Sequence, residues 1–177
     1  DGSVPDESSD LYTTPLVIDT TTHVRARAFS AADGAGLVAS HSYLFLAEDV
    51  REFSSNLPLV VVDSLGLNIN AETARTSVRR PVYSVFLDTD EEGRSHLTGP
   101  ADFAGRAGMK VRGNSSRRSA KKQYSFEVWD EVDEDRNVPI FGFPPGSDWV
   151  CHAPYGDKTL MRNYLAYKWW GDLGRYS

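Results

Sequence analysis

The clearest chemical potential in this sequence lies in a run of basic residues between Arg106 and Lys122. It contains seven basic side chains and no acid: Arg106, Lys110, Arg112, Arg117, Arg118, Lys121 and Lys122. The chain as a whole carries a net charge of -6, so the sign of the charge is reversed locally here. Arginine forms paired hydrogen bonds with phosphate oxygens, and lysine supplies a compact positive charge. The basic run is therefore suited to binding phosphate.

The middle of the basic run is a polar turn, residues 113–116, with the sequence Gly-Asn-Ser-Ser. Such a turn exposes backbone N–H groups and two hydroxyls, which can surround phosphate oxygens. A second interpretation remains open, in which the basic turn only pairs with the acidic stretch that follows at residues 130–135. The turn alone does not decide between them.

Lys122 has the same strand parity as two apolar residues, Tyr124 and Phe126. Side chains two apart on a strand point to the same face, so Lys122 should point toward a core edge or a cleft. Lys121 should then face solvent together with Gln123. The alternative is that the aliphatic stem of Lys122 packs while its ammonium group reaches water.

No metal site is expected from this sequence. The four histidines are scattered and lack helix-face metal spacing: His23, His41, His96 and His152. The acidic stretches at residues 88–92 and 130–135 do not have the spacing of a calcium loop, which favours solvated turns. Cys151 and His152 are adjacent, and adjacent strand residues point to opposite faces, so they are not expected to form a thiol–base pair.

Composition places the chain among soluble globular proteins. It has 177 residues, 40% hydrophobic and 25% charged, which suits one medium domain or two small ones. An acidic chain is a poor nucleic-acid binder, so no nucleic-acid partner is expected. The longest apolar run, residues 57–62, is far too short to span a membrane. One cysteine cannot form a disulfide within the chain.

Periodicity predicts a mainly β chain, of α+β class, with one helix near its end. Alternating or apolar runs predict strands at residues 23–29, 42–46, 57–62, 82–88, 109–112 and 124–129. Asp157 is the expected N-cap of the helix, and Gly174 is its expected stop. Apolar residues recur between them at helical spacing: Leu160, Met161, Tyr164, Leu165 and Trp169.

Three blocks in the second part of the chain resemble the CotH kinase family, the atypical kinases similar to spore coat protein H. They comprise residues 111–117 (VRGNSSR) with 121–124 (KKQY), residues 141–144 (FGFP) with 147–150 (SDWV), and residues 157–167 (DKTLMRNYLAY). Their order and short spacing make the likeness more specific than any single block. The likeness extends from Pro58 to the end of the chain.

This resemblance implies an antiparallel sheet like the first lobe of a protein kinase, which binds ATP with a divalent metal, Mg or Mn. By the likeness, Lys122 or its neighbour Lys121 contacts the nucleotide phosphates, and Arg112, Asn114 and Ser115 shape the adjoining turn. The catalytic acids of the family are expected beyond Ser177, so this chain alone is not expected to catalyse phosphoryl transfer. The helix also lacks the glutamate that orients the lysine in ordinary kinases.

The first part of the chain resembles the small β-sandwich repeat found at the end of chitobiase-like enzymes. The matching pieces are residues 1–5, 11–12, 15–16, 20–29 and 40–45. The first strand of the repeat is missing, so a truncated sandwich is expected. The predicted organisation is therefore a sandwich repeat at residues 1–47, a linker at 48–57 and a CotH-like part at 58–177.

Two functions follow from these resemblances. The first is the ATP-binding lobe of an atypical kinase in an exported bacterial protein, located outside the cell or on its surface. Its partners would be a protein substrate or a neighbouring surface protein, together with the rest of its own polypeptide. The second is a non-catalytic structural or adhesive scaffold at the same location. Carbohydrate binding by the sandwich is a weaker third interpretation, because few aromatic residues are available to stack on a sugar.

Overall fold

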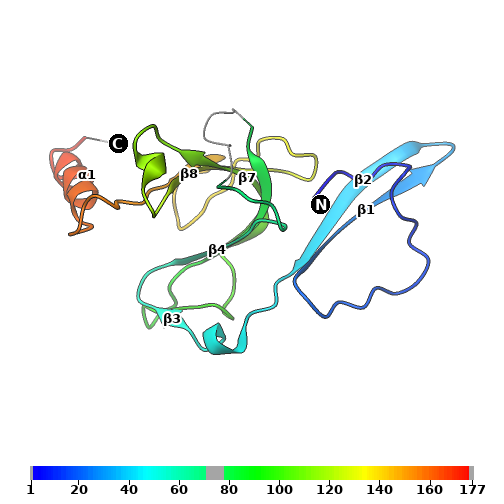
Figure 1. The fold of residues 1–177 in the computed structure, drawn as a ribbon, viewed down its shortest axis with the longest axis horizontal. Coiled ribbons are helices and arrows are strands. Elements are labelled where there is room, and N and C mark those ends of the chain that lie inside the picture. Colours follow the sequence, from blue (N-terminus) through cyan, green and yellow to red (C-terminus); the bar gives the residue numbers. More distant parts are fainter. Residues whose placement is uncertain (1, 71–77, 176–177) are drawn as a thin grey trace.

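A computed structural model describes residues 2–70 and 78–175 of the chain (Figure 1). The elements follow the order β1 (Thr22–Ser30), β2 (Gly34–Tyr43), η1 (Glu48–Val50), β3 (Ser54–Ser55), β4 (Leu59–Asp63), β5 (Arg80–Leu87), β6 (Ser95–His96), β7 (Phe103–Arg112), η2 (Ser116–Arg118), β8 (Gln123–Val128), β9 (Asp148–Cys151) and α1 (Arg162–Asp172). The described part of the chain is thus mainly β with one C-terminal α-helix, as predicted.

The central element is a five-stranded antiparallel sheet in the order β4-β5-β7-β8-β9. One face of this sheet carries the hydrophobic core, whose buried members are Val82, Phe86, Ala107, Met109, Phe126, Val128, Val138 and Ile140. Phe126 and Val128 are fully buried, and Tyr124 packs against the same cluster. The alternation predicted for this strand is therefore confirmed.

Three of the predicted strands differ from the observed ones. We expected a strand at residues 42–46, whereas β2 spans Gly34–Tyr43 and ends before Leu44. We expected a short strand at residues 109–112, whereas β7 has ten residues and begins at Phe103. The alternation of apolar and polar residues is not visible in the first part of β7. The reason is that three residues there carry no apolar side chain: Gly105, Arg106 and Gly108. We expected residues 57–62 to form a buried strand, but β4 forms an edge of the sheet and Val60 is 45% exposed.

The first part of the chain contributes a hairpin of β1 and β2, which pair antiparallel from Thr22 with Tyr43 to Ser30 with Gly34. The alternation in β1 led us to expect its alanine face to be covered. Instead Ala26 and Ala28 are exposed, and the arginine side is half-buried. The face is inverted because Arg25 makes hydrogen bonds with the neighbouring part of the molecule.

A group of hydrogen-bonded residues, which we call the arginine junction, connects the hairpin and the N-terminal segment to the sheet. Its members are Gly2, Arg25, Arg106, Glu131 and Asp133. Arg106 is only 7% exposed; it donates hydrogen bonds to the Asp133 carboxylate and, over 3.1 Å, to the Gly2 carbonyl. Arg25 donates to the same carbonyl over 2.6 Å and to the Glu131 carbonyl. Burial, and then the Arg106 charge, lower the pKa of Arg25 from its ordinary value.

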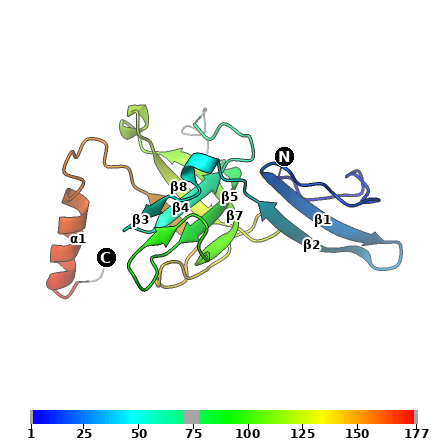
Figure 2. The same ribbon diagram turned by 90° about the horizontal axis from the view of Figure 1, so that it is seen from below.

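The helix α1 lies at the end of the molecule opposite the hairpin, as two perpendicular views show (Figures 1 and 2). It ends where expected, because Gly174 adopts a φ of 70° and its N–H bonds to the Gly171 carbonyl. Its predicted apolar face is not buried, however. Leu160, Tyr164 and Trp169, three members of that face, are each about 60% exposed, and no residue of the helix is fully buried.

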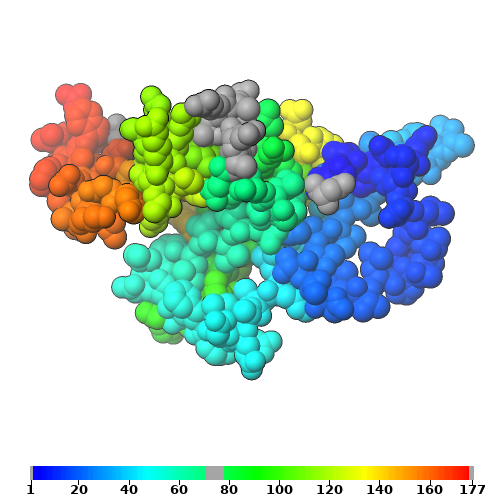
Figure 3. Space-filling model, viewed as in Figure 1, coloured from blue at the N-terminus to red at the C-terminus, as the bar shows by residue number. Residues whose placement is uncertain are grey.

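The space-filling view shows the N-terminal segment, in dark blue, on the side of the molecule that carries the hairpin (Figure 3). The proposed linker region also contributes structure, since β3 at Ser54–Ser55 pairs with β6 at Ser95–His96. Within the described residues, no helix has the length and apolarity required to cross a membrane.

Candidate functional site

The basic run forms the end of β7, the loop that carries η2, and the start of β8. Gly113 makes the loop possible, because it adopts a φ of 100° and a Cβ there would lie 2.0 Å from the Ser116 hydroxyl oxygen. Backbone bonds from Arg118 to Ser115 and from Ser119 to Ser116 then tighten η2. A polar turn was expected here, and the structure contains one.

Lys122 is directed back into this loop. Its ammonium group donates to the Arg117 carbonyl over 2.7 Å and approaches the Ser119 carbonyl at 3.5 Å. Lys122 is half-buried and Lys121 is exposed, as expected, although both residues precede β8. Gln123, which was expected to face solvent with Lys121, is half-buried instead. The observed contacts make Lys122 the side chain that holds the basic loop in shape.

The other predicted contact residues lie on the outside of the loop. Arg112, Asn114 and Ser115 are exposed. Arg106, at the far end of the basic run, is buried in the arginine junction and is paired with Asp133. The structure therefore divides the basic run: one member pairs with the acidic stretch at residues 130–135, and the remainder surrounds the loop.

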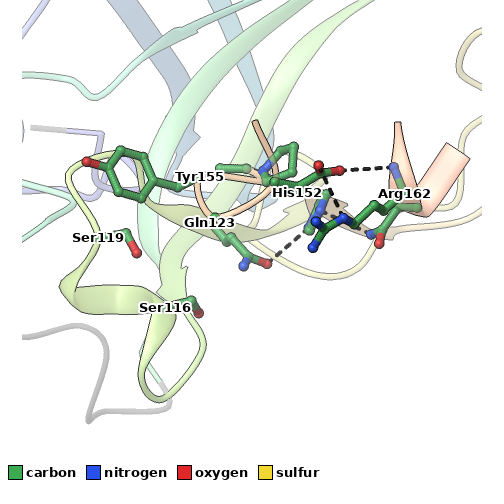
Figure 4. Close-up of a pocket in the computed structure, with 11 residues that line it drawn as sticks. Ser116, Ser119, Gln123, His152, Tyr155 and Arg162 are labelled. Atoms are coloured by element: carbon green, nitrogen blue, oxygen red, sulfur yellow. Dashed lines mark hydrogen bonds and ion pairs between the residues drawn. The ribbon is translucent and has the colours of Figure 1, made fainter. Parts of the chain in front are cut away.

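A cavity of about 250 Å³ opens beside the loop, between η2 and the start of α1 (Figure 4). Its lining residues are Ser116, Ser119, Gln123, His152, Ala153, Pro154, Tyr155, Gly156, Asp157, Arg162 and Asn163. None of the five residues predicted to contact a nucleotide is among them, although Ser116, Ser119 and Gln123 are their close neighbours in sequence. The cavity brings together hydroxyl, amide, imidazole and guanidinium groups, which are the usual donors to anionic ligands.

His152 lies at the centre of a short hydrogen-bonded chain in this cavity. Its Nδ1 is 3.3 Å from the Gln123 side-chain oxygen, and its Nε2 is 3.0 Å from the Asn163 amide nitrogen. These partners require Nδ1 to carry the proton and Nε2 to accept from Asn163. We did not predict this role. The pairing of Tyr124 with Cys151 places the next residue, His152, beside Gln123, so the signal was a strand register rather than a local pattern.

Cys151 itself faces the core, on the opposite side of β9 from His152, as expected for adjacent strand residues. Burial raises the pKa of the Cys151 thiol above its ordinary value. A raised pKa keeps the thiol protonated at neutral pH, so Cys151 is not a reactive nucleophile.

Asp157 shapes the other wall of the cavity. It accepts hydrogen bonds from the Thr159 hydroxyl over 2.7 Å and from the backbone N–H of Arg162 over 2.9 Å. Because α1 begins at Arg162 rather than directly after Asp157, Asp157 caps the helix from five residues away, and Met161 occupies the N-cap position. The hydrogen bond from Thr159, and then that from Arg162, lower the pKa of Asp157 below its ordinary value of 3.8.

Replacing Asp157 by alanine is expected to loosen the first turn of α1. A lowered pKa means that the ionised carboxylate stabilises the folded form above the unfolded-state pKa, and that this contribution is lost as the pH falls through the folded-state pKa. The amide NMR shift of Arg162 should therefore titrate below about pH 4 in the wild type. In Asp157→Ala it should be displaced and independent of pH over that range.

Asp172→Ala is the control for this experiment, because it removes an acid from the other end of the same helix. It should leave the Arg162 shift and its titration unchanged. An Arg162 shift that titrates equally in Asp157→Ala would mean that a different group accepts this hydrogen bond.

The residues described by the structure do not fit a metal ion held by the protein. No group of three or more His, Cys, Asp or Glu side chains within them has the arrangement needed to hold one. Asp157 is the one acid in the cavity lining, and its oxygens already accept from Thr159 and Arg162. The cavity donors thus suit phosphate, whereas its oxygen ligands do not suit a cation.

Comparisons with known families match two segments of the chain. Residues 109–177 match the family model described as CotH kinase protein, and residues 1–40 match that of the chitobiase/beta-hexosaminidase C-terminal domain. Both resemblances stated from the sequence are thereby confirmed, in the same order along the chain. The match to the CotH family begins at Met109 on β7, so it contains the basic loop, the cavity lining and α1. Searches of curated proteins and of solved structures gave no significant match.

Proposed function

We propose that the CotH-like part of this chain binds the phosphate groups of ATP in the cavity between the basic loop and α1. One observation carries the proposal: blocks of sequence about 40 residues apart meet at this single cavity. The first block supplies Ser116 and Gln123, and the third block supplies Arg162. A cavity built from the first and third blocks is the place where these two blocks can act together.

The groups at the cavity support binding of an anion. The Arg162 side chain is 78% exposed and lies 3.5 Å from Asp157, so its remaining N–H groups face the opening. Arginine suits phosphate because its planar N–H groups bond to two oxygens at once. The hydroxyls of Ser116 and Ser119 lie on the opposite wall of the cavity from Arg162 (Figure 4). In this proposal Lys121, Arg112, Asn114 and Ser115 provide positive charge and donors around the rim.

In this proposal magnesium or manganese binds as part of a complex with the nucleotide, and the protein itself does not hold the ion. Mg²⁺ often keeps several waters and is held by one or two carboxylates together with substrate phosphates. When bound, it would neutralise phosphate charge. The residues of this chain would hold and orient the phosphates, and Lys122 would keep the loop in the shape that receives them.

Replacing Lys122 by alanine is expected to weaken binding of a non-hydrolysable ATP analogue about tenfold or more, measured by calorimetry with and without magnesium. The loss follows because a charged donor to two loop carbonyls is removed, and such hydrogen bonds contribute about 1.5–3 kcal/mol. Lys121→Ala removes the same charge from an exposed rim residue, where solvent screens it, so the loss of affinity should be smaller, about twofold. Equal losses in the two variants would contradict the role given to Lys122.

The second candidate is a structural or adhesive scaffold in which the CotH-like part no longer binds nucleotide. The observation that favours it is that α1 contains no glutamate to orient a lysine. The calorimetry decides between them. Measurable binding to the wild type that is weakened in Lys122→Ala supports the nucleotide site, and no binding to the wild type supports the scaffold.

We further propose that the protein is exported by a bacterium and works outside the cell or on its surface. The combination of a chitobiase-type C-terminal repeat with a CotH-like part supports this location. The partner would then be a protein substrate or a neighbouring surface protein. Fractionation of the producing cells, followed by detection of the protein in the medium or wall fraction, tests it; recovery only from the cytoplasm would overturn it.

A further inference from the structure

A serine, a histidine and an aspartate lie in line where the hairpin meets the sheet. Ser42 on β2 pairs directly with His23 on β1, and its hydroxyl lies 2.8 Å from His23 Nδ1. His23 Nε2 lies 3.1 Å from the Asp63 carboxylate on β4. The site is separate from the cavity described above, and it uses none of the residues of the basic run.

The hydrogen-bond partners assign the proton on the imidazole. An ionised carboxylate only accepts, so His23 Nε2 carries the proton that is donated to Asp63. In neutral His23 the other nitrogen, Nδ1, is then an acceptor, and the Ser42 hydroxyl donates to it. This is the arrangement in which an imidazole can remove a proton from a serine.

Each member of the line is held in place. Asp63 also accepts the backbone N–H of Leu65 over 2.8 Å, which fixes the carboxylate. The ring of His23 packs on that of Tyr83, with their centroids 5.4 Å apart. The His23 side chain is 16% exposed and that of Asp63 is 32% exposed, so both are shielded yet reachable. Partial shielding strengthens the attraction between an imidazolium and a carboxylate.

Ser42 opens on an apolar cavity of about 220 Å³ on the face of the sheet opposite the core. Apart from Ser42, its lining is made almost entirely of aliphatic side chains, one tyrosine and a glycine: Leu44, Leu46, Val61, Val85, Leu87, Leu97, Tyr83 and Gly99. The Tyr83 hydroxyl contacts Ser42, and burial raises the pKa of Tyr83, so the phenol keeps its proton. The cavity therefore offers a hydroxyl nucleophile, a hydrogen-bond donor and an apolar wall.

We propose that Ser42, His23 and Asp63 form a nucleophilic site that hydrolyses esters of short apolar acyl groups. Ser42 Oγ bonds to the ester carbonyl carbon while its proton moves to His23 Nδ1, and the Tyr83 hydroxyl donates to the carbonyl oxygen. The ester C–O bond then breaks, and the alcohol leaves with the proton from His23. Water then attacks the acyl-serine in the same way, which releases the carboxylic acid and restores the Ser42 hydroxyl. The overall reaction is a hydrolysis without oxidation or reduction.

The first test uses the unaltered protein and needs no variant. The full chain is incubated with an alkyl fluorophosphonate, which reacts with activated serines, and the product is analysed by intact mass and peptide mapping. The proposal requires one adduct, located on Ser42. The absence of an adduct on Ser42 would overturn it.

The second test is the hydrolysis of p-nitrophenyl butyrate, whose acyl group matches the apolar cavity. Ser42→Ala and Asp63→Asn are each expected to lower the rate about 100-fold or more, because each removes part of the proton transfer. His41→Ala removes an exposed imidazole from the same hairpin and should keep the full rate. Hydrolysis that persists in Ser42→Ala would overturn the proposal. Thermal unfolding of each variant separates loss of activity from loss of fold.

Discussion

Arg106→Ala is expected to lower the free energy of unfolding by about 3 kcal/mol. Removing one partner of a buried ion pair costs about 3–5 kcal/mol, because the other charge is left without compensation. The Asp133 side chain keeps 33% of its surface exposed, so water can partly solvate it after the change. That exposure places the expected loss at the lower end of the range.

The measurement is urea unfolding of the wild type, Arg106→Ala, Asp133→Asn and the double variant. Replacing both partners removes the pair without leaving a charge behind, so the double variant should be more stable than the sum of the single losses predicts. Arg136→Ala, an exposed arginine beside the same acidic loop, is the control and should cost less than about 0.5 kcal/mol. Additive losses in the double variant would mean that Arg106 and Asp133 are not coupled.

Gly108→Ala is expected to be similarly damaging, at about 3 kcal/mol. A Cβ at this buried strand position would lie 2.1 Å from one atom of the Trp129 ring and 2.5 Å from another. The indole cannot move without losing its hydrogen bond from Nε1 to the Glu127 carboxylate, which is 2.8 Å long. Forcing extra volume into a packed site costs about 1–3 kcal/mol, and the lost hydrogen bond adds about 1 kcal/mol.

Gly146→Ala is the matched control, because a Cβ there would meet no atom within 4 Å and its φ is not positive. Thermal unfolding should show a melting temperature that falls by several degrees for Gly108→Ala, about 2–4 °C per kcal/mol at this chain length. It should change little for Gly146→Ala. A fall of the same size in both variants would show that the glycine backbone, rather than contact with Trp129, sets the cost.

Those parts of the fold that depend on local pattern could be predicted from the sequence. The alternation of Tyr124, Phe126 and Val128 defined both the strand and its buried face, since the apolar face of β8 packs on the core. Gly174 marked the end of the helix, because its φ of 70° suits glycine. The family resemblances were predictable for the same reason: ordered blocks of residues are themselves a local signal.

Features that depend on distant contacts could not be predicted in this way. The alternation in β1 was real, but the covered side is that of Arg25, which bonds to Gly2 and Glu131. The cavity beside the basic loop escaped prediction for a related reason. His152 reaches Gln123 only through the register of β8 with β9, and pairing partners cannot be read from a single strand.

The arginine junction also has a consequence for the order in which the chain folds. Neighbours in the main sheet follow one another closely in sequence, so their pairing closes short loops. The bonds from Arg106 to Gly2 and from Arg25 to Glu131 join residues 104 and 106 positions apart. Closing such long loops carries a larger entropy cost, so these bonds should form after the sheet, on the native side of the rate-limiting barrier. The junction would then mainly lower the unfolding rate and change the folding rate little. The lifetime of the attached hairpin would therefore depend on these bonds.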